Sequence, residues 1–306
     1  MTQNTQPILW ALDPFDTTFD TPKLSQMTEA LSVSLDAPIE IVYVLSRKSL
    51  NWTGEFSKGW LRDYQPKTKE ALEKIASELK LHPAVTILSM PNKSNLATDV
   101  KKLLDYAKKV KAKAIVVNTH KRKGLERWYL GSFAETALMH TKIPLIMLSP
   151  NAHWEKIKRI LIPTDFSTES FKALKKMTPE LKKLAAEVVL FHKLPDAIEP
   201  VLQMGAHMAG GGWVSVYQYM EHETEERSQD ARIWQQWLAN EGIQSRFDIE
   251  EKPGPVIESI LQKAEEYDCQ LIAVESHSGP ISSAFIGSVA RQLVRQSDRP
   301  VWVTHS

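Results

Sequence analysis

An internal repeat sets the strongest limit on how this 306-residue chain can fold. An apolar run that ends in aspartate, Ile8–Asp13, returns as Ile160–Asp165, at an offset of 152 residues (165 − 13). Three later landmarks return in the same order at offsets of 156 (288 − 132) or 157 (277 − 120): Ala114–His120 as Leu271–His277, Gly131-Ser132 as Gly287-Ser288, and Ile143–Met147 as Arg299–Val303. Ordered matches of this kind predict two copies of one structural unit that differ by a few loop insertions or deletions.

Each copy alternates short β-branched runs with longer segments of helical period, which is typical of βαβ units around a parallel sheet. In the first copy we expect strands over 8–13, 38–45, 84–90, 113–118 and 144–149, and helices over 22–36, 63–80, 95–110 and 131–141. In the second copy we expect strands over 158–165, 186–193, 245–250, 270–275 and 300–304, and helices over 168–184, 221–241, 254–267 and 287–297. The predicted fold class is therefore α/β, with two tandem doubly wound, Rossmann-like domains, each a five-stranded parallel sheet with four helices.

The boundary between the copies is expected at the short polar turn Pro150–Trp154, which gives domains over 1–150 and 155–306. This turn is too short to act as a flexible tether. A chain of this length also matches about two domains of common size.

Composition narrows the classes of partner and compartment. The formal net charge is +1, so the chain as a whole has no field that would attract nucleic acid or an anionic membrane. The only cysteine, Cys269, cannot form an intramolecular disulfide, and no apolar run approaches the ~18 residues of a membrane span. The N-terminal residues lack the pattern of a secretory signal. We therefore expect a cytoplasmic protein without a membrane partner.

A ligand site is expected beyond the carboxyl ends of the strands, where the winding direction of a doubly wound sheet reverses. Asp13 and Asp165 each end a first strand at this edge, and Gly131-Ser132 and Gly287-Ser288 each open a helix. Free backbone N–H groups at a helix start attract an anion such as a nucleotide phosphate. The alternative is that Ser132 and Ser288 are ordinary helix caps.

Several motifs together carry a family resemblance: Pro163–Ser167 at a strand end, Ser276-His277, then Gly287-Ser288 before a helix, and Pro300–Val303. They resemble the universal stress protein (UspA-like) family in its tandem two-domain, bacterial type, which has an adenine nucleotide alpha hydrolase-like fold. The resemblance covers nearly the whole chain twice. It implies a protective or signalling role in the stress response, with induction under starvation or damage.

The resemblance also places the family's nucleotide site on this sequence, with clear departures from its pattern. Nucleotide-binding members have two early glycines in the phosphate loop, where this chain has Asn118 and Lys121 in the first copy. In the second copy Glu275 takes the place of the first glycine and Ser278 best matches the second. A bulky side chain obstructs close backbone approach to phosphates, and a carboxylate repels them.

The two copies differ at the position of the family's adenine-side valine, which is Val44 in the first copy and Lys193 in the second. Taken together, the candidate nucleotide-binding residues are Asp13, Val44, Lys121, Gly131, Ser132, Pro163, Asp165, Ser278, Gly287 and Ser288. Neither copy keeps an intact pocket, so the nature of any cofactor stays open, with ATP or AMP as the candidates.

Three functional hypotheses follow. The leading one is a non-catalytic stress-response protein with degenerate nucleotide pockets, because no general base or metal-ligand spacing is evident. The second is an ATP- or AMP-binding protein with slow ATP hydrolysis. The third is a binder of apolar ligands beneath the Met-rich connection Pro195–Met220, which contains Gly210-Gly211-Gly212.

One segment, 100–127, has a marked excess of basic residues. They are Lys101, Lys102, Lys108, Lys109, Lys111, Lys113, Lys121, Arg122, Lys123 and Arg127, against Asp105 and Glu126. No nucleic-acid motif accompanies them, so we expect a solvated helix face and no nucleic-acid partner.

The last strand of each copy is the expected interface. The resemblance implies that Leu145–Leu148 and Val301–Val303 pair and join the two domains within one chain. An unpaired apolar edge there would favour aggregation. A homodimer stays open as a further possibility.

Overall fold

The computed structural model describes residues 6–16, 20–47, 59–90, 95–121, 128–129, 132–149, 156–195, 216–276 and 288–305. The chain divides into two compact units. Unit 1 comprises residues 1–156 together with 276–305, and unit 2 comprises residues 157–275.

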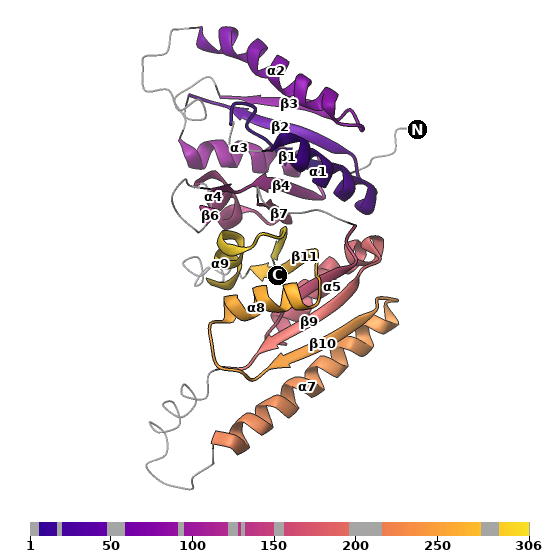
Figure 1. Ribbon diagram of the computed structural model, residues 1–306. Coiled ribbons are helices and arrows are strands. Elements are labelled where there is room, and N and C mark those ends of the chain that lie inside the picture. Colours follow the sequence, from indigo (N-terminus) through magenta and orange to yellow (C-terminus); the bar gives the residue numbers. More distant parts are fainter. Residues whose placement is uncertain are drawn as a thin grey trace. The chain divides into compact units, whose positions relative to one another are not determined.

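The sheet of unit 1 contains strands from both copies of the repeat (Figure 1). Its strands are β1 (Ile8–Ala11), β2 (Ile39–Leu45), β3 (Ala84–Ser89), β4 (Ala114–Asn118), β7 (Leu145–Leu148) and β12 (Val301–His305). They are ordered β12-β7-β4-β1-β2-β3. All neighbours are parallel except β12, which is antiparallel to β7. This pairing of the last strands confirms the sequence prediction.

The helices of unit 1 are α1 (Thr21–Leu35), α2 (Trp60–Glu78), α3 (Leu96–Lys109), α4 (Ser132–His140) and α9 (Ser288–Gln296). The bounds of α3 show how local sequence fixes a helix. The Asn95 side chain accepts from the Thr98 N–H at 2.9 Å, while the Asn95 N–H donates to the Thr98 hydroxyl at 2.9 Å. This capping box satisfies two donors that a helix start leaves without partners.

Unit 2 is a smaller parallel sheet (Figure 1). Its strands are β8 (Arg159–Pro163), β9 (Glu187–Lys193), β10 (Ser245–Glu250) and β11 (Leu271–Ser276), in the order β10-β9-β8-β11. Its described helices are α5 (Thr168–Leu184), α7 (Val216–Asn240) and α8 (Val256–Glu266).

Burial explains why the strands read as continuous apolar runs. Ile8, Leu9 and Trp10 of β1 are fully buried, as are Val188–Leu190 of β9. A parallel sheet covered by helices on both faces has no solvent-facing side, so both faces select apolar residues. The α/β fold class with two Rossmann-like repeats is confirmed.

Three local features differ from the sequence expectations. Helix α2 begins at Trp60 and α7 at Val216, so each extends into a connection that was expected to be a loop. A two-stranded ladder, β5 (His120–Lys121) with β6 (Trp128–Tyr129), was not predicted. Two-residue strands leave no alternating pattern long enough to read in a sequence.

No helix within the described ranges is both long and apolar enough to cross a membrane.

Candidate functional site at the carboxyl ends of the strands

The strand orders place the expected crevice in each repeat. In unit 1 the chain runs from β1 to β2 on one side, and β4 lies on the other side of β1. In unit 2 the same reversal lies between β8 and β11. Asp13 follows β1 and Asp165 follows β8, so both aspartates lie at the carboxyl edge where ligands of such sheets bind.

In the first repeat, Asp13 shapes the turn that leaves β1. Its Oδ1 accepts a hydrogen bond from the Phe15 N–H at 3.0 Å. A side-chain oxygen that bonds the N–H two residues later forms an Asx turn. The Phe15 ring then meets the edge of Tyr43 with 6.2 Å between centroids. Half-buried Asp13 therefore holds an aromatic side chain over the end of β2.

Val44 keeps the apolar character that an adenine-side wall requires. It lies in β2, is 6% exposed, and pairs in register with Leu88 of β3.

Asn118, the last residue of β4, occupies the position of a lost glycine. It is 6% exposed, and its Oδ1 accepts a long hydrogen bond of 3.4 Å from the Trp10 indole N–H. A buried amide that is bonded to the core cannot swing aside easily, because its partner would then lose its hydrogen bond. A glycine at this position would have no side chain to bond Trp10, so Asn118 makes this strand end bulkier and more firmly held.

A buried Ser46–Asp99 pair near the same edge was missed by sequence reasoning. The Ser46 hydroxyl, directly after β2, donates to Asp99 Oδ2 at 2.5 Å, and both residues are buried. A signal was available, because Asp99 falls at the position of α3 that shares the buried face with Val100 and Leu103. A carboxylate on a buried helix face needs a nearby donor.

In the second repeat, the turn after β8 is built more tightly around Asp165. Its Oδ1 accepts from the Ser167 N–H at 2.9 Å and from the Ser170 hydroxyl at 2.7 Å. Desolvation alone would raise the pKa of Asp165, but these hydrogen bonds outweigh it and hold the pKa below the ordinary value of 3.8. The carboxylate is therefore ionised and engaged with its own loop.

His192 and Phe166 fill the carboxyl end of β8 and β9. His192 Nδ1 donates to the Thr164 carbonyl at 2.7 Å, and its ring centroid lies 5.7 Å from that of Phe166. Phe166 is buried, has a left-handed φ of 58°, and meets Trp234 of α7 at 5.1 Å. These contacts fill the carboxyl end of the second repeat with protein side chains.

Burial also sets the protonation of His192. Desolvation lowers its pKa from the ordinary value of 6.5, more than the hydrogen bond to the Thr164 carbonyl and the charges of Asp165 and Glu223 raise it; Arg227 lowers it further. His192 is therefore neutral at pH 7.

We expect the free energy of unfolding to fall as the pH drops below about 6.5, before most carboxylates titrate. The unfolded chain binds a proton on His192 in that range, whereas the folded chain resists it, so protons favour unfolding. Substitution H192N keeps an N–H donor near Thr164 but removes the titration. Urea unfolding at pH 7, 6 and 5 should show a shallower pH dependence for this variant. The matched control is H82N at exposed His82, whose φ of 41° suits asparagine; equal slopes for H192N and the wild type would contradict the assignment.

Lys193, at the end of β9, stands where the first repeat has Val44. Its side chain is only 2% exposed, and its ammonium lies 3.9 Å from Glu250 Oε1. The ammonium also donates to the Lys252 carbonyl. A buried cation is tolerated only with such partners. The wall that is apolar in the first repeat is therefore charged and internally bonded in the second.

The family model described as "Universal stress protein family" matches residues 5–149 and 156–305. The chain belongs to the universal stress protein family. A search of the curated proteins finds no match.

Solved structures show the same tandem fold. A universal stress protein from Archaeoglobus fulgidus DSM 4304 is similar with a TM-score of 0.70 and 17% identity, and the match covers 100% of this chain and 99% of that one. The functionally unknown protein PA1789 from Pseudomonas aeruginosa PAO1 is similar with a TM-score of 0.58 and 13% identity, over 98% and 92% of the two chains. At such identities the likeness concerns the fold alone.

The structure describes some of the other residues that were predicted to bind nucleotide in this universal stress protein. Ser132 is the exposed first residue of α4, and its carbonyl accepts from the Thr136 hydroxyl at 2.7 Å. Pro163 ends β8, Lys121 pairs in register with Trp128, and Ser288 is the first residue of α9. Gly131, Ser278 and Gly287 lie outside the described residues, as does most of the connection from Pro195 to Met220.

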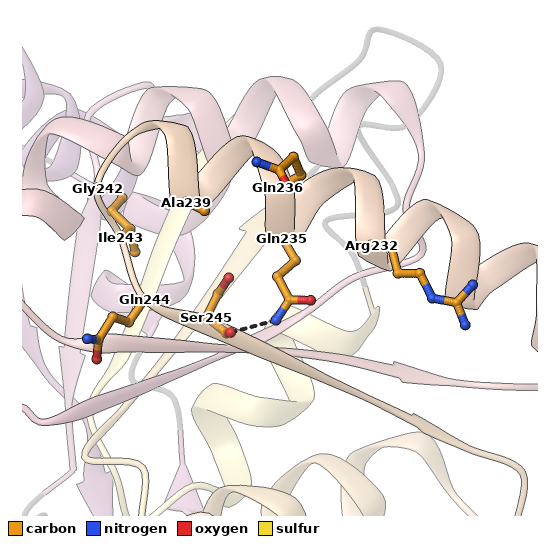
Figure 2. A pocket seen from close by; sticks show the side chains of 8 residues that line it. All are labelled: Arg232, Gln235, Gln236, Ala239, Gly242, Ile243, Gln244 and Ser245. Atoms are coloured by element: carbon orange, nitrogen blue, oxygen red, sulfur yellow. Dashed lines mark hydrogen bonds between the residues drawn. The ribbon is translucent and has the colours of Figure 1, made fainter.

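Figure 2 shows a separate groove of about 700 Å³ in unit 2. It is lined by Arg232, Gln235, Gln236, Ala239, Gly242, Ile243, Gln244 and Ser245. The Gln235 side-chain amide donates to the Ser245 carbonyl at 2.7 Å, drawn as the dashed line. The groove therefore belongs to the end of α7 and the amino end of β10, and none of the predicted site residues lines it.

Within the described residues, no group of three or more His, Cys, Asp or Glu side chains is arranged to hold a metal ion.

Proposed function

We propose that this universal stress protein is a non-catalytic stress-response protein with a protective or signalling role, in which the nucleotide crevices are degenerate. The observation that carries the proposal is Lys193, whose side chain is 2% exposed and whose ammonium donates to the Lys252 carbonyl. An adenine ring that replaced this contact would remove the carbonyl that the buried ammonium bonds and leave only the longer approach to Glu250, which is costly.

The first repeat supports the same proposal less strongly. Asn118 is buried and bonded to Trp10, so a nucleotide would have to displace a side chain that is held in the core. The first repeat nevertheless keeps Val44 and the Asx turn of Asp13. Binding of ATP or AMP in this repeat, with slow ATP hydrolysis, is therefore the second candidate function.

The third hypothesis, a binder of apolar ligands, depended on the Met-rich connection, of which residues 196–215 lie outside the described residues. It stays a prediction.

Isothermal titration calorimetry with ATP and with AMP tests the proposal. We expect no saturable heat and no shift in melting temperature at ~1 mM nucleotide. A ligand present at one hundred times its Kd stabilises the folded state by about 2.7 kcal/mol, which a melting curve resolves easily. The flat result would therefore exclude a Kd below about 10 μM.

The same substitution in the two repeats gives a matched pair of variants, Asp13→Asn and Asp165→Asn. Saturable heat in the wild type that is lost in Asp13→Asn and retained in Asp165→Asn would establish the second candidate in place of our proposal. Release of phosphate that disappears in Asp13→Asn would show that the protein is an ATPase.

We propose residues 1–150 and 155–306 as the two universal stress protein domains and the cytoplasm as the compartment. Cys269 is buried and, as the single cysteine of the sequence, cannot form an intramolecular disulfide, which suits a reducing environment. The lysines of α3 face solvent, and Lys101 is paired with Asp105, as expected for a solvated helix face in the basic segment.

A further inference from the structure

The pairing of β7 with β12 is symmetric with respect to the two copies of the repeat. Ile146 and Trp302 occupy equivalent positions in the two copies (302 − 146 = 156), and they lie directly opposite each other in the ladder. On either side, Leu145 pairs with Val303 and Met147 with Val301. Each position therefore faces its own equivalent or a symmetric neighbour, as residues do beside a twofold axis.

The helices beside these strands obey the same relation. Helix α4 spans Ser132–His140 and α9 spans Ser288–Gln296, so both bounds differ by 156 residues (288 − 132 and 296 − 140). Both helices belong to unit 1 (Figure 1). A side chain of α4 can consequently meet the residue of α9 that corresponds to it.

One such equivalent pair carries opposite charges. Glu135 corresponds to Arg291 (291 − 135 = 156), and Glu135 Oε1 lies 3.4 Å from Arg291 Nε. Arg295, one turn later in α9, donates from Nη2 to the same oxygen at 3.1 Å. These side chains are 27%, 31% and 41% exposed, so water screens the pairs only in part.

The two side chains at the centre of the β7–β12 ladder, Ile146 and Trp302, differ in volume. Ile146 and Trp302 are both buried, at 3% and 4% exposed. Ile115 of β4 donates to the Pro144 carbonyl, and Thr119, directly after β4, donates to the Leu148 carbonyl. The alternation of the ladder therefore turns the Ile146 backbone toward β4, and Ile146 is a non-hydrogen-bonded partner of Trp302. Side chains approach most closely in such pairs. A branched aliphatic residue against an indole fills this space.

Pairing with a second copy through the same repeat would lose both matches. A first repeat against a first repeat would oppose Glu135 to Glu135 and Ile146 to Ile146. A second repeat against a second repeat would oppose four arginines and two indoles. Like charges at contact distance repel, and an overfilled or underfilled core is destabilised.

We propose that Glu135 with Arg291 and Arg295, together with Ile146 against Trp302, are specificity determinants that select the opposite repeat as the partner of α4 and β7. The interface closes with a first repeat against a second repeat, and like repeats of two copies do not pair. This selectivity is independent of nucleotide binding, so it goes beyond the proposed function.

Charge reversal in the full-length chain tests the pairing. Glu135→Arg alone, and Arg291→Glu with Arg295→Glu, should each lower the melting temperature by about 2–5 °C. The triple reversal restores opposite charges and should return to within about 1 °C of the wild type. Glu135→Gln separates lost attraction from added repulsion, and Arg232→Glu on α7 controls for a general effect of charge. A triple variant no more stable than the single and double reversals would overturn the proposal.

A mixing experiment tests partner choice directly. Glu135→Arg carries only cations at this interface and Arg291→Glu/Arg295→Glu only anions, so each opposes like charges within its own chain. A 1:1 mixture refolded together at low salt should give mixed dimers by native mass spectrometry, well above the statistical 1:2:1 ratio. A statistical ratio would overturn the proposal. The refolding is done at about millimolar protein, which matches the effective concentration of two tethered repeats and lets a second chain compete with chain connectivity.

Discussion

Proline at Ile146 should unfold the central part of unit 1 at a much lower temperature than in the wild type. Strand β7 lies between β4 and β12, and the Ile146 backbone faces β4. Proline removes this N–H, breaks a ladder hydrogen bond and fixes φ. A buried carbonyl left without its donor alone costs about 1–3 kcal/mol, so we expect a total on the order of 3 kcal/mol. We expect the melting temperature of unit 1 to fall by at least about 6 °C. Differential scanning calorimetry measures the change.

The control for this variant is proline in an edge strand. Val85 of β3 is suitable, because the Met90 N–H donates to Leu45 of β2 and the alternation of the ladder turns the Val85 N–H away from β2. Val85→Pro should therefore cost much less than Ile146→Pro. Similar melting temperatures for both variants would contradict a central position for β7.

Truncation of Trp10 to alanine should have an effect of similar size on unit 1. Trp10 is the largest fully buried side chain of β1, which lies between β2 and β4. Loss of a buried tryptophan leaves a cavity and costs about 3–5 kcal/mol. The Asn118 side chain would also lose its indole donor. Urea unfolding followed by circular dichroism should show a lower midpoint, and hydrogen exchange should localise the change to β1 and β4.

Two variants sharpen the interpretation of this result. Trp10→Phe retains an aromatic ring but removes the indole N–H together with the five-membered part of the indole, so we expect a smaller loss than for Trp10→Ala, about 1–3 kcal/mol. Val33→Ala on α1, at 73% exposed, should remain within about 0.5 kcal/mol of the wild type. If Trp10→Phe were as unstable as Trp10→Ala, the part of the indole that carries the N–H bonded to Asn118, and not the burial of an aromatic ring as such, would dominate.

The repeat made most of the fold predictable from the sequence. Strand β2 was expected over 38–45 and spans Ile39–Leu45, and α3 was expected over 95–110 and spans Leu96–Lys109. Long apolar runs and a capping sequence such as Asn95–Thr98 are local signals, so one sequence contains them. Pairing of β7 with β12 was also predictable, because the family resemblance supplied it.

The contents of the candidate site were less predictable, because they depend on contacts between distant residues. Trp10 and Asn118 are 108 positions apart, and Ser46 and Asp99 are 53 apart. The sequence showed that Lys193 replaces the apolar Val44, but its bond to the Lys252 carbonyl follows from the approach of β9 to the residues after β10. Such contacts have no periodicity, and several loop residues of the predicted site lie outside the described residues.

Unit 1 is built from two segments that are far apart in the sequence, so its folding depends on the order in which the chain is synthesised. Unit 2, residues 157–275, is inserted between the two segments of unit 1, and α9 and β12 come last. A ribosome releases the chain from the N-terminus onward, so unit 2 is complete before β7 meets β12. Until then the edge of β7 is open to pairing with other strands. During synthesis there is therefore a stage at which the apolar strand β7 is exposed and open to binding by a chaperone. That stage ends only when β12 has emerged from the ribosome.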